Sequence, residues 1–200
     1  MSGYPLFLRL EGQCCLVYGG GRVALRKIRS LLRRGARVTC VSKDFCASLR
    51  ARNTLGRAKQ SQSLRLLRRT SGVPRNDELK EARLVIAATS DRNFNARIAQ
   101  ACRKKKIWVN VVDDPELCDF LVPAVLERGP LQIAISTGGA SPLFARRLRE
   151  ELEKVIPSST GKLLEKLGRM RRKHSVIAPQ GLPRSSKRKI NEGVARQRSQ

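Results

Sequence analysis

The sequence Cys14-Cys15-Leu16-Val17-Tyr18-Gly19-Gly20-Gly21-Arg22-Val23-Ala24 decides the fold, because an apolar run leads directly into three glycines. A continuous apolar run of this length is typical of a strand buried on both faces of a parallel sheet. From residue 23 to residue 32 the apolar residues recur at helical spacing, and Gly35 is placed to end that helix. Residues 37–41 predict a second strand, so the whole stretch predicts a βαβ unit.

The glycines fit the Gly-x-Gly-x-x-Gly/Ala fingerprint of dinucleotide-binding folds. We expect Gly19 to make the tight turn, Gly21 to let the backbone approach a pyrophosphate, and Ala24 to permit close packing of helix and strand. The diphosphate would rest on the amides at the positive end of the helix. A merely structural turn is the alternative, but the position between a buried strand and an amphipathic helix favours dinucleotide binding.

Helices and strands alternate further along the chain. The expected elements are a strand at 6–10, a helix at 45–58, a strand at 64–67, a helical turn near 77–82, a strand at 84–89, a helix capped by Asp91 and ending near 105, and a strand at 107–112. This alternation predicts an α/β fold with a Rossmann-type, mostly parallel sheet.

The pattern changes after residue 113. The expected elements are strands at 120–124 and 131–136 and helices at 143–155 and 161–173. Ser141 is expected to cap the first of these helices, with Pro142 at its first position. Beyond His174 the chain is rich in Ser, Pro, Gly and basic residues, which predicts a loosely ordered tail.

The chain is strongly basic, with 42 Lys or Arg against 16 Asp or Glu and a formal net charge of +26. Such a field favours polyanions, whether nucleic acid, a phosphorylated cofactor or a substrate with many carboxylates, although an arginine-rich proteome would give the same surface. No apolar run approaches the roughly 20 residues of a membrane span. The chain opens with no secretory signal, so we expect a cytoplasmic protein without a membrane partner.

The six cysteines form no Cys-x-x-Cys pair, and His174 is the only histidine. Soft-metal sites need clustered ligands of these two types, so no protein-built metal site is expected. Cys14, Cys15 and Cys40 lie in apolar runs, where a reduced cysteine behaves as a small hydrophobe, with a redox function as the alternative.

The residues after the second strand leave the cofactor open. Dinucleotide folds usually end this strand in an acid that binds the adenine ribose. Here Val41-Ser42-Lys43 occupies that place and the first acid is Asp44. Lys43 and Arg22 would favour the 2′-phosphate of NADP, so the residues alone do not choose between NAD and NADP.

Several stretches together resemble the precorrin-2 dehydrogenase family, which includes the N-terminal part of siroheme synthase. The matching stretches are Val17-Tyr18-Gly19-Gly20-Gly21-Arg22-Val23-Ala24-Leu25-Arg26-Lys27, Gly35-Ala36-Arg37-Val38-Thr39, Ile86-Ala87-Ala88-Thr89-Ser90-Asp91, Val109-Asn110-Val111-Val112-Asp113, and Ala134-Ile135-Ser136-Thr137-Gly138-Gly139-Ala140-Ser141-Pro142. The resemblance extends over residues 4–157 and is weakest across 45–80. No methyltransferase-like sequence follows, so we expect the chain to lack that further activity of siroheme synthase.

This resemblance implies NAD-dependent oxidation of precorrin-2 to sirohydrochlorin, on the route to siroheme. It implies a homodimer whose active sites lie close to the interface. Residues 1–113 would form an NAD-binding Rossmann domain, 114–157 a dimerisation region, and 158–200 a short helical region with a basic tail. Some members of the family also insert Fe²⁺, and the sequence does not separate a dehydrogenase from such a bifunctional enzyme.

The resemblance also assigns cofactor residues. NAD, which the family prefers, would contact the first turn and the segment after the second strand. These contacts are Gly19, Gly21, Arg22, Val23, Lys43 and Asp44, with Thr89 at the end of the strand expected at 84–89.

Asp113 matches the essential aspartate of the family and is the expected catalytic residue. It follows a parallel strand at its carboxyl end, where open α/β sheets place their ligands. Oxidation of precorrin-2 removes a hydride and a proton, and a carboxylate beside the macrocycle would accept the proton. A capping carboxylate before Pro115 is the alternative, while Asp114 is an adjacent decoy and Asp91 is a helix cap.

A second small-residue loop is the expected substrate contact. Thr137, Gly138 and Ser141 stand at a helix start suited to carboxylates, although a tight strand-to-helix turn explains them equally well. Asn110 and Arg146 complete the expected substrate contacts, and the basic helix face around Arg146 would also suit plain solvation.

A non-catalytic NAD-sensing or nucleic-acid-binding module is the competing function class, supported by the net charge of +26. The chain has no helix-turn-helix or zinc-finger signature, and its basic residues are not interleaved with aromatic ones for base stacking. Nucleic acid is therefore not an expected partner.

Overall fold

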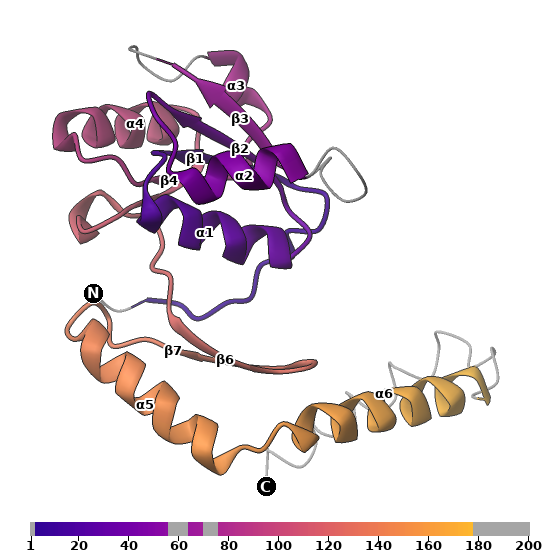
Figure 1. The fold of residues 1–200 in the computed structure, drawn as a ribbon. Helices are drawn as coiled ribbons and strands as arrows, with labels where there is room; N and C mark the ends of the chain where they lie inside the picture. The colour runs from indigo at the N-terminus through magenta and orange to yellow at the C-terminus, as the bar shows by residue number, and fades with distance from the viewer. Residues whose placement is uncertain (1–2, 56–63, 70–75, 178–200) are drawn as a thin grey trace, which may run out of the picture. The chain divides into compact units, whose positions relative to one another are not determined.

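The structure is a computed structural model that describes residues 3–55, 64–69 and 76–177 (Figure 1). The chain divides into two compact units. The first comprises the described residues of 1–124 and 136–145, and the second comprises residues 125–135 and 146–177. This division rests on compactness, so the functional boundaries expected near residues 113 and 157 stay predictions.

A five-stranded sheet forms the centre of the first unit. Its strands are β1 (Cys14–Tyr18), β2 (Arg37–Ser42), β3 (Leu64–Arg68), β4 (Leu84–Ala87) and β5 (Trp108–Val111). All neighbouring strands are parallel, and their order in space is β3-β2-β1-β4-β5. The order reverses between β1 and β4, the position where Rossmann folds bind ligands at the carboxyl ends of the strands. The predicted α/β class is confirmed.

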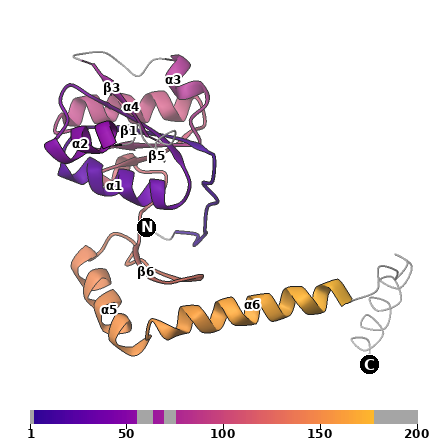
Figure 2. The same ribbon diagram turned by 45° about the vertical axis from the view of Figure 1, so that its right-hand side comes forward.

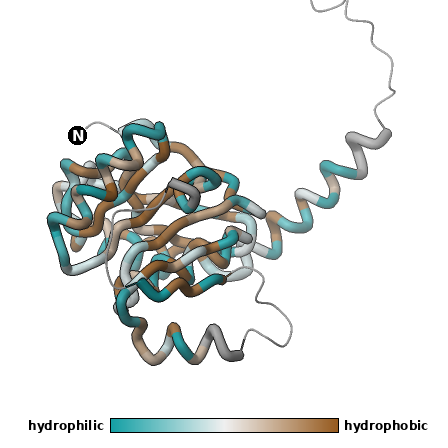
Figure 3. Tube along the Cα trace, turned by 90° about the horizontal axis from the view of Figure 1, so that it is seen from above, coloured by the Kyte–Doolittle hydropathy of each residue, from teal (hydrophilic) through white to brown (hydrophobic). Residues whose placement is uncertain are grey.

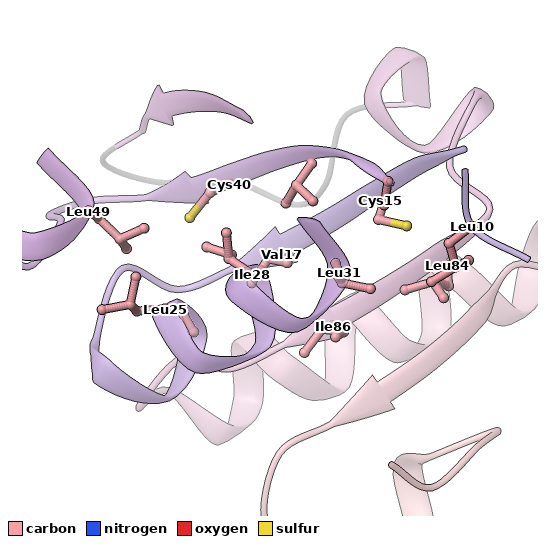
Figure 4. Close-up of a cluster of buried hydrophobic side chains, with 13 residues drawn as sticks. Leu10, Cys15, Val17, Leu25, Ile28, Leu31, Cys40, Leu49, Leu84 and Ile86 are labelled. Atoms are coloured by element: carbon pink, nitrogen blue, oxygen red, sulfur yellow. The ribbon is translucent and has the colours of Figure 1, made fainter. Parts of the chain in front are cut away.

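Helices cover both faces of this sheet (Figure 2). The elements are α1 (Arg22–Arg33) and α2 (Ala47–Leu55) on one face, and α3 (Asn76–Lys80) and α4 (Arg92–Lys104) on the other. Figure 4 shows Leu25, Ile28 and Leu31 of α1 packed against apolar residues of the strands. The strands are the most hydrophobic part of the unit, whereas the helices alternate in hydropathy along their length (Figure 3). The helical spacing of apolar residues therefore identified Ala24, Ile28 and Leu31 correctly as buried, whereas Val23 is exposed.

Two predicted strands are wrong. Residues 6–10 form no strand, because they pair with no strand of the two described sheets, although Leu8 and Leu10 pack against the core. The strand expected at 120–124 is displaced along the chain to β6 (Ala124–Arg128). Residues 118–120 instead fold back along β5, and Pro123 has no N–H to donate to a strand ladder.

The second unit is built on a hairpin. It contains most of β6, β7 (Leu131–Ile135), the larger part of α5 (Pro142–Val155) and α6 (Ser159–Ile177). Arg128 stabilises the end of α5 by donating to the carbonyl oxygens of Ile156, at 3.1 Å, and Glu153, at 3.2 Å. A Cβ at Gly161 would collide with the backbone of Arg128, so the start of α6 lies directly against the hairpin.

The ends of the helices can be compared with the predicted bounds and caps. The backbone N–H of Phe144 donates to Ser141 Oγ at 3.2 Å, which confirms Ser141 as the cap of α5. The last helix is longer than the predicted 161–173 and includes His174. The expected helix end at 56–58 and the predicted tail beyond residue 177 lie outside the described residues.

All six cysteines are free thiols, and Cys15, Cys40 and Cys102 are buried. Burial raises the pKa of each of these three thiols to about 12, which keeps them protonated at neutral pH. This environment fits the prediction of small reduced hydrophobes for Cys15 and Cys40. Among the helices that the structure describes, none is long and apolar enough to cross a membrane.

The Asp91 cap of α4 makes a testable contribution to stability. Its carboxylate accepts the backbone N–H of Phe94 at 2.9 Å, so Asp91→Ala should lower the free energy of unfolding by about 1 kcal/mol. Asp91→Asn keeps an acceptor and should lose much less. Urea unfolding curves measure both variants, and an Ala variant as stable as the wild type would contradict the cap.

Candidate cofactor and catalytic site

The expected cofactor and catalytic residues meet at one edge of the sheet. The glycine turn follows β1, Lys43 and Asp44 follow β2, Thr89 follows β4, and Asp113 follows β5. Because the strands are parallel, their carboxyl ends lie at the same edge. The structure thus brings together residues that are up to 94 positions apart in the sequence.

Gly19 and Gly20 are required by close backbone contacts. Gly19 has φ +116°, and a Cβ there would collide with the carbonyl oxygen of Ala88 at the end of β4. A Cβ at Gly20 would collide with the carbonyl oxygen of Asp44, just beyond β2. Gly20 is not a fingerprint position, although its place between two fingerprint glycines was the available signal in the sequence.

Gly21 differs because the protein itself leaves room for a side chain there. It caps α1 with φ −83°, an ordinary value, and a Cβ would meet nothing within 4 Å. The first turn of α1 carries no acidic side chain, and Arg22 and Val23 are exposed. This open helix start fits a pyrophosphate, since backbone amides and the positive end of the helix point toward it. Ala24 is fully buried, as expected for close helix–strand packing.

Lys43 and Asp44 lie beside the glycine turn. Ser42 Oγ donates to the carbonyl oxygen of Asp44 at 2.6 Å, and the N–H of Cys46 donates to the carbonyl oxygen of Gly20 at 2.8 Å. Arg68, the last residue of β3, forms an ion pair with Asp44 at 2.9 Å. No sequence motif marks Arg68, because only the pairing of β2 with β3 places it beside Asp44.

Thr89 fixes the loop after β4. Its hydroxyl donates to Asn95 Oδ1 at 2.7 Å, and the side-chain amide of buried Asn95 donates to the carbonyl oxygen of Thr89 at 3.0 Å. These bonds hold the loop next to Gly19. A direct cofactor contact by Thr89 stays a prediction.

Asp113 has an unusual backbone. Its φ is +61°, in the left-handed region that few residues other than glycine adopt, and such residues cluster at functional sites. Its side chain is exposed. Within the described ranges no hydrogen bond or ion pair engages its carboxylate, which leaves the group available to a ligand.

Lys27 of α1 interacts electrostatically with this carboxylate and was not singled out as a site residue. Burial and the neighbouring Arg26 lower the pKa of the Lys27 ammonium, while Cys118 and Asp113 act in the opposite direction. A half-buried cation therefore lies close enough to Asp113 for their charges to interact. The signal in the sequence was its place at the end of the matching stretch 17–27.

The acids near Asp113 have structural partners. Asp114 is only 11% exposed and pairs with Arg92 at 3.1 Å, and the expectation that it takes no part in catalysis stays a prediction. Asp119 accepts the backbone N–H of Val109 at 3.0 Å. Buried Asn110 donates to the carbonyl oxygen of Phe120 at 2.9 Å. Like the bond of Asp119, this bond holds residues 118–120 alongside β5. Substrate binding by Asn110 stays a prediction.

The second small-residue loop is an ordered helix start. Gly138 and Gly139 have φ +63° and +90°, and the N–H of Ser141 donates to Thr137 Oγ1 at 3.0 Å. Arg146 belongs to the second compact unit, where it is exposed and pairs with Glu150 at 2.9 Å. These contacts explain the loop structurally, and substrate binding by it stays a prediction.

In the part of the chain that the structure describes, no group of three or more His, Cys, Asp or Glu side chains could hold a metal ion.

Comparisons with known proteins agree with this geometry. The family model described as "Putative NAD(P)-binding" matches residues 6–124, and the model described as "Sirohaem biosynthesis protein central" matches residues 128–154. The siroheme synthase of Thioalkalivibrio sulfidiphilus is 43% identical over 169 residues, which cover 82% of this chain and 32% of that protein. The siroheme synthase of Nitrosomonas europaea is also 43% identical, with 86% and 35% covered.

The chain therefore spans about a third of the length of these curated relatives. Among solved structures, "SirC, precorrin-2 dehydrogenase" superposes with a TM-score of 0.69 at 28% identity, covering 96% of this chain and 89% of that one. The family model covers more than half of the chain and includes the glycine turn and every strand of the parallel sheet. The chain belongs to this NAD(P)-binding family, with the fold of the precorrin-2 dehydrogenase structure.

Proposed function

We propose that the chain is an NAD-dependent precorrin-2 dehydrogenase, which converts precorrin-2 to sirohydrochlorin in siroheme biosynthesis. The observation that carries the proposal is Asp113, an exposed carboxylate on a left-handed backbone at the same sheet edge as the glycine turn. The likeness to a precorrin-2 dehydrogenase structure over nearly the whole chain supports it, as do the siroheme synthase relatives.

The residues at the sheet edge fit a nicotinamide dinucleotide. Gly19 and Gly20 keep the turn close to its neighbouring strands, and the space at Gly21 leaves the start of α1 open to a diphosphate. When bound there, NAD⁺ supplies the acceptor for the hydride.

Asp113 is the proton acceptor of this reaction. Loss of a hydride from precorrin-2 must be balanced by loss of a proton, and a carboxylate oxygen of Asp113 takes it as general base. The left-handed backbone places this side chain beyond the last strand, while Asp114 is held in its own ion pair. The positive charge of Lys27 interacts with this carboxylate.

Precorrin-2 carries eight carboxylates, and the strongly basic chain attracts such a substrate. We place Asn110, Thr137, Gly138, Ser141 and Arg146 at the substrate. We further propose a homodimer in the cytoplasm, without a membrane or nucleic-acid partner.

Insertion of Fe²⁺ into sirohydrochlorin is a second candidate function, favoured by relatives that are siroheme synthases. The same carboxylate would accept pyrrole protons, with Fe²⁺ as a substrate. Adding Fe²⁺ to the completed dehydrogenase reaction, and recording the absorption spectrum of the product, separates the two candidates.

Replacing Asp113 tests the catalytic assignment. Asp113→Asn should lower kcat by about 10²-fold or more, because the proton acceptor is lost, and should leave NADH binding unchanged. The measurement is anaerobic NADH formation at 340 nm with enzymatically generated precorrin-2.

The matched control is Asp114→Asn, one residue away. It loses the ion pair with Arg92, so it should lower stability while kcat stays close to that of the wild type. A folded Asp113→Asn protein with wild-type kcat would rule out Asp113 as the base. A wild-type protein that binds NADH but never reduces NAD⁺ would instead favour a sensing function.

Substitutions at two neighbouring glycines distinguish an effect on cofactor binding from an effect on stability. Gly21→Ala meets open space in the protein, so it should fold normally, yet its methyl group should weaken NADH binding about tenfold or more by blocking the approach of the diphosphate. Gly20→Ala must displace the backbone at Asp44 and should lower the thermal midpoint as well. Fluorescence titration with NADH and thermal unfolding measure the two effects. Wild-type affinity in Gly21→Ala would contradict this cofactor site.

A further inference from the structure

We propose that Arg68 is a specificity-determining residue, which by pairing with Asp44 allows the adenosine end of the cofactor site to accept NADP⁺ as well as NAD⁺. The proposal rests on the dinucleotide site at the glycine turn. It goes further by naming a residue, on a strand outside the fingerprint, that sets how strongly the site discriminates between the two cofactors.

The position of Arg68 follows from the register of the sheet. Arg68 on β3 lies opposite Ser42 on β2, so the two strands end at the same level. From there the guanidinium Nη2 reaches Asp44 Oδ1 at 2.9 Å, while Nε donates to the carbonyl oxygen of Lys43 at 3.0 Å. The side chain of Arg68 thus lies along the segment that follows β2.

This segment is fixed against the glycine turn. The carbonyl oxygen of Asp44 accepts the hydroxyl of Ser42 at 2.6 Å and leaves no room for a Cβ at Gly20. Dinucleotide folds bind the adenine ribose at the end of this second strand. The pair of Asp44 and Arg68 is therefore placed at the ribose and its 2′ substituent.

The charges of the pair decide what the site accepts. An unpaired carboxylate binds the ribose 2′-hydroxyl of NAD and repels the 2′-phosphate of NADP. Here the carboxylate is paired with Arg68, whose positive charge offsets part of its repulsion toward a 2′-phosphate, and both side chains are highly exposed, at 76% and 74%. Exposed pairs of this kind are weak, so a phosphate can replace Asp44 as the partner of the guanidinium.

The neighbouring Arg69 provides a contrast. Its guanidinium pairs with Glu78 at 2.7 Å, and both side chains are largely buried. The guanidinium of Arg69 is therefore held inside the unit by its ion pair, whereas the guanidinium of Arg68 is exposed to solvent at the edge of the sheet. The exposed ammonium of Lys43 adds to the same positive edge.

Fluorescence titration with NADH and NADPH tests the proposal on the full chain. The wild type should bind the two within about tenfold of each other. Arg68→Gln should weaken NADPH binding about tenfold and leave NADH binding unchanged or stronger, while Arg68→Lys should recover part of the NADPH affinity. Asp44→Asn should weaken NADH binding and spare NADPH.

Arg65→Gln is the matched control, because it removes the same charge from an exposed arginine of β3 opposite Thr39, three residues before Arg68. It should leave both affinities unchanged. The inference is overturned if NADH binds but NADPH binds about 100-fold more weakly or more, or if Arg68→Gln and Arg65→Gln have the same effect. Absence of NADH binding in the wild type would instead overturn the dinucleotide site itself.

Discussion

The close approach of the glycine turn to the ends of two neighbouring strands is the constraint on which the site depends. Gly19 touches the backbone beyond β4 and Gly20 touches the backbone at Asp44, and neither contact leaves room for a Cβ. The turn therefore sets the distance between the ends of β1, β2 and β4. It also aims the start of α1 at the space beside Gly21, where the diphosphate binds in the proposed function.

Asp113 differs from the other aspartates of this region, because its carboxylate has no structural partner among the described residues. Asp91 caps α4, Asp114 pairs with Arg92, and Asp119 binds the backbone of β5. Each of these acids is used to hold the protein together. Asp113 instead extends from a left-handed backbone position with Lys27 close by. A carboxylate that no hydrogen bond or ion pair of the described residues engages suits a proton acceptor.

Local patterns predicted the Rossmann unit because its signals are local. The buried runs of β1 and β4, the spacing of α1 and the caps Asp91 and Ser141 each act within one element or turn. The strand expected at 120–124 failed because hydrogen bonds to β5, which lies about ten residues earlier in the chain, decide how that segment runs.

Part of the site was hidden from the sequence for the same reason. Lys27 becomes relevant only when α1 packs beside the end of β5, and Arg68 only when β3 pairs with β2. Gly19, Gly21 and Asp113 were identified because a fingerprint and a family resemblance mark them directly. Residues whose function depends on partners far away in the sequence can be identified only once the folded sheet shows which residues are neighbours.

The most direct test of the account is a crystal structure of the protein with NAD⁺ bound. The account predicts the diphosphate on the amides at the start of α1, the adenosine beside Asp44, and the nicotinamide on the side of the sheet edge that carries Asp113. NAD⁺ bound away from the glycine turn, or with its nicotinamide directed away from Asp113, would contradict the proposed site.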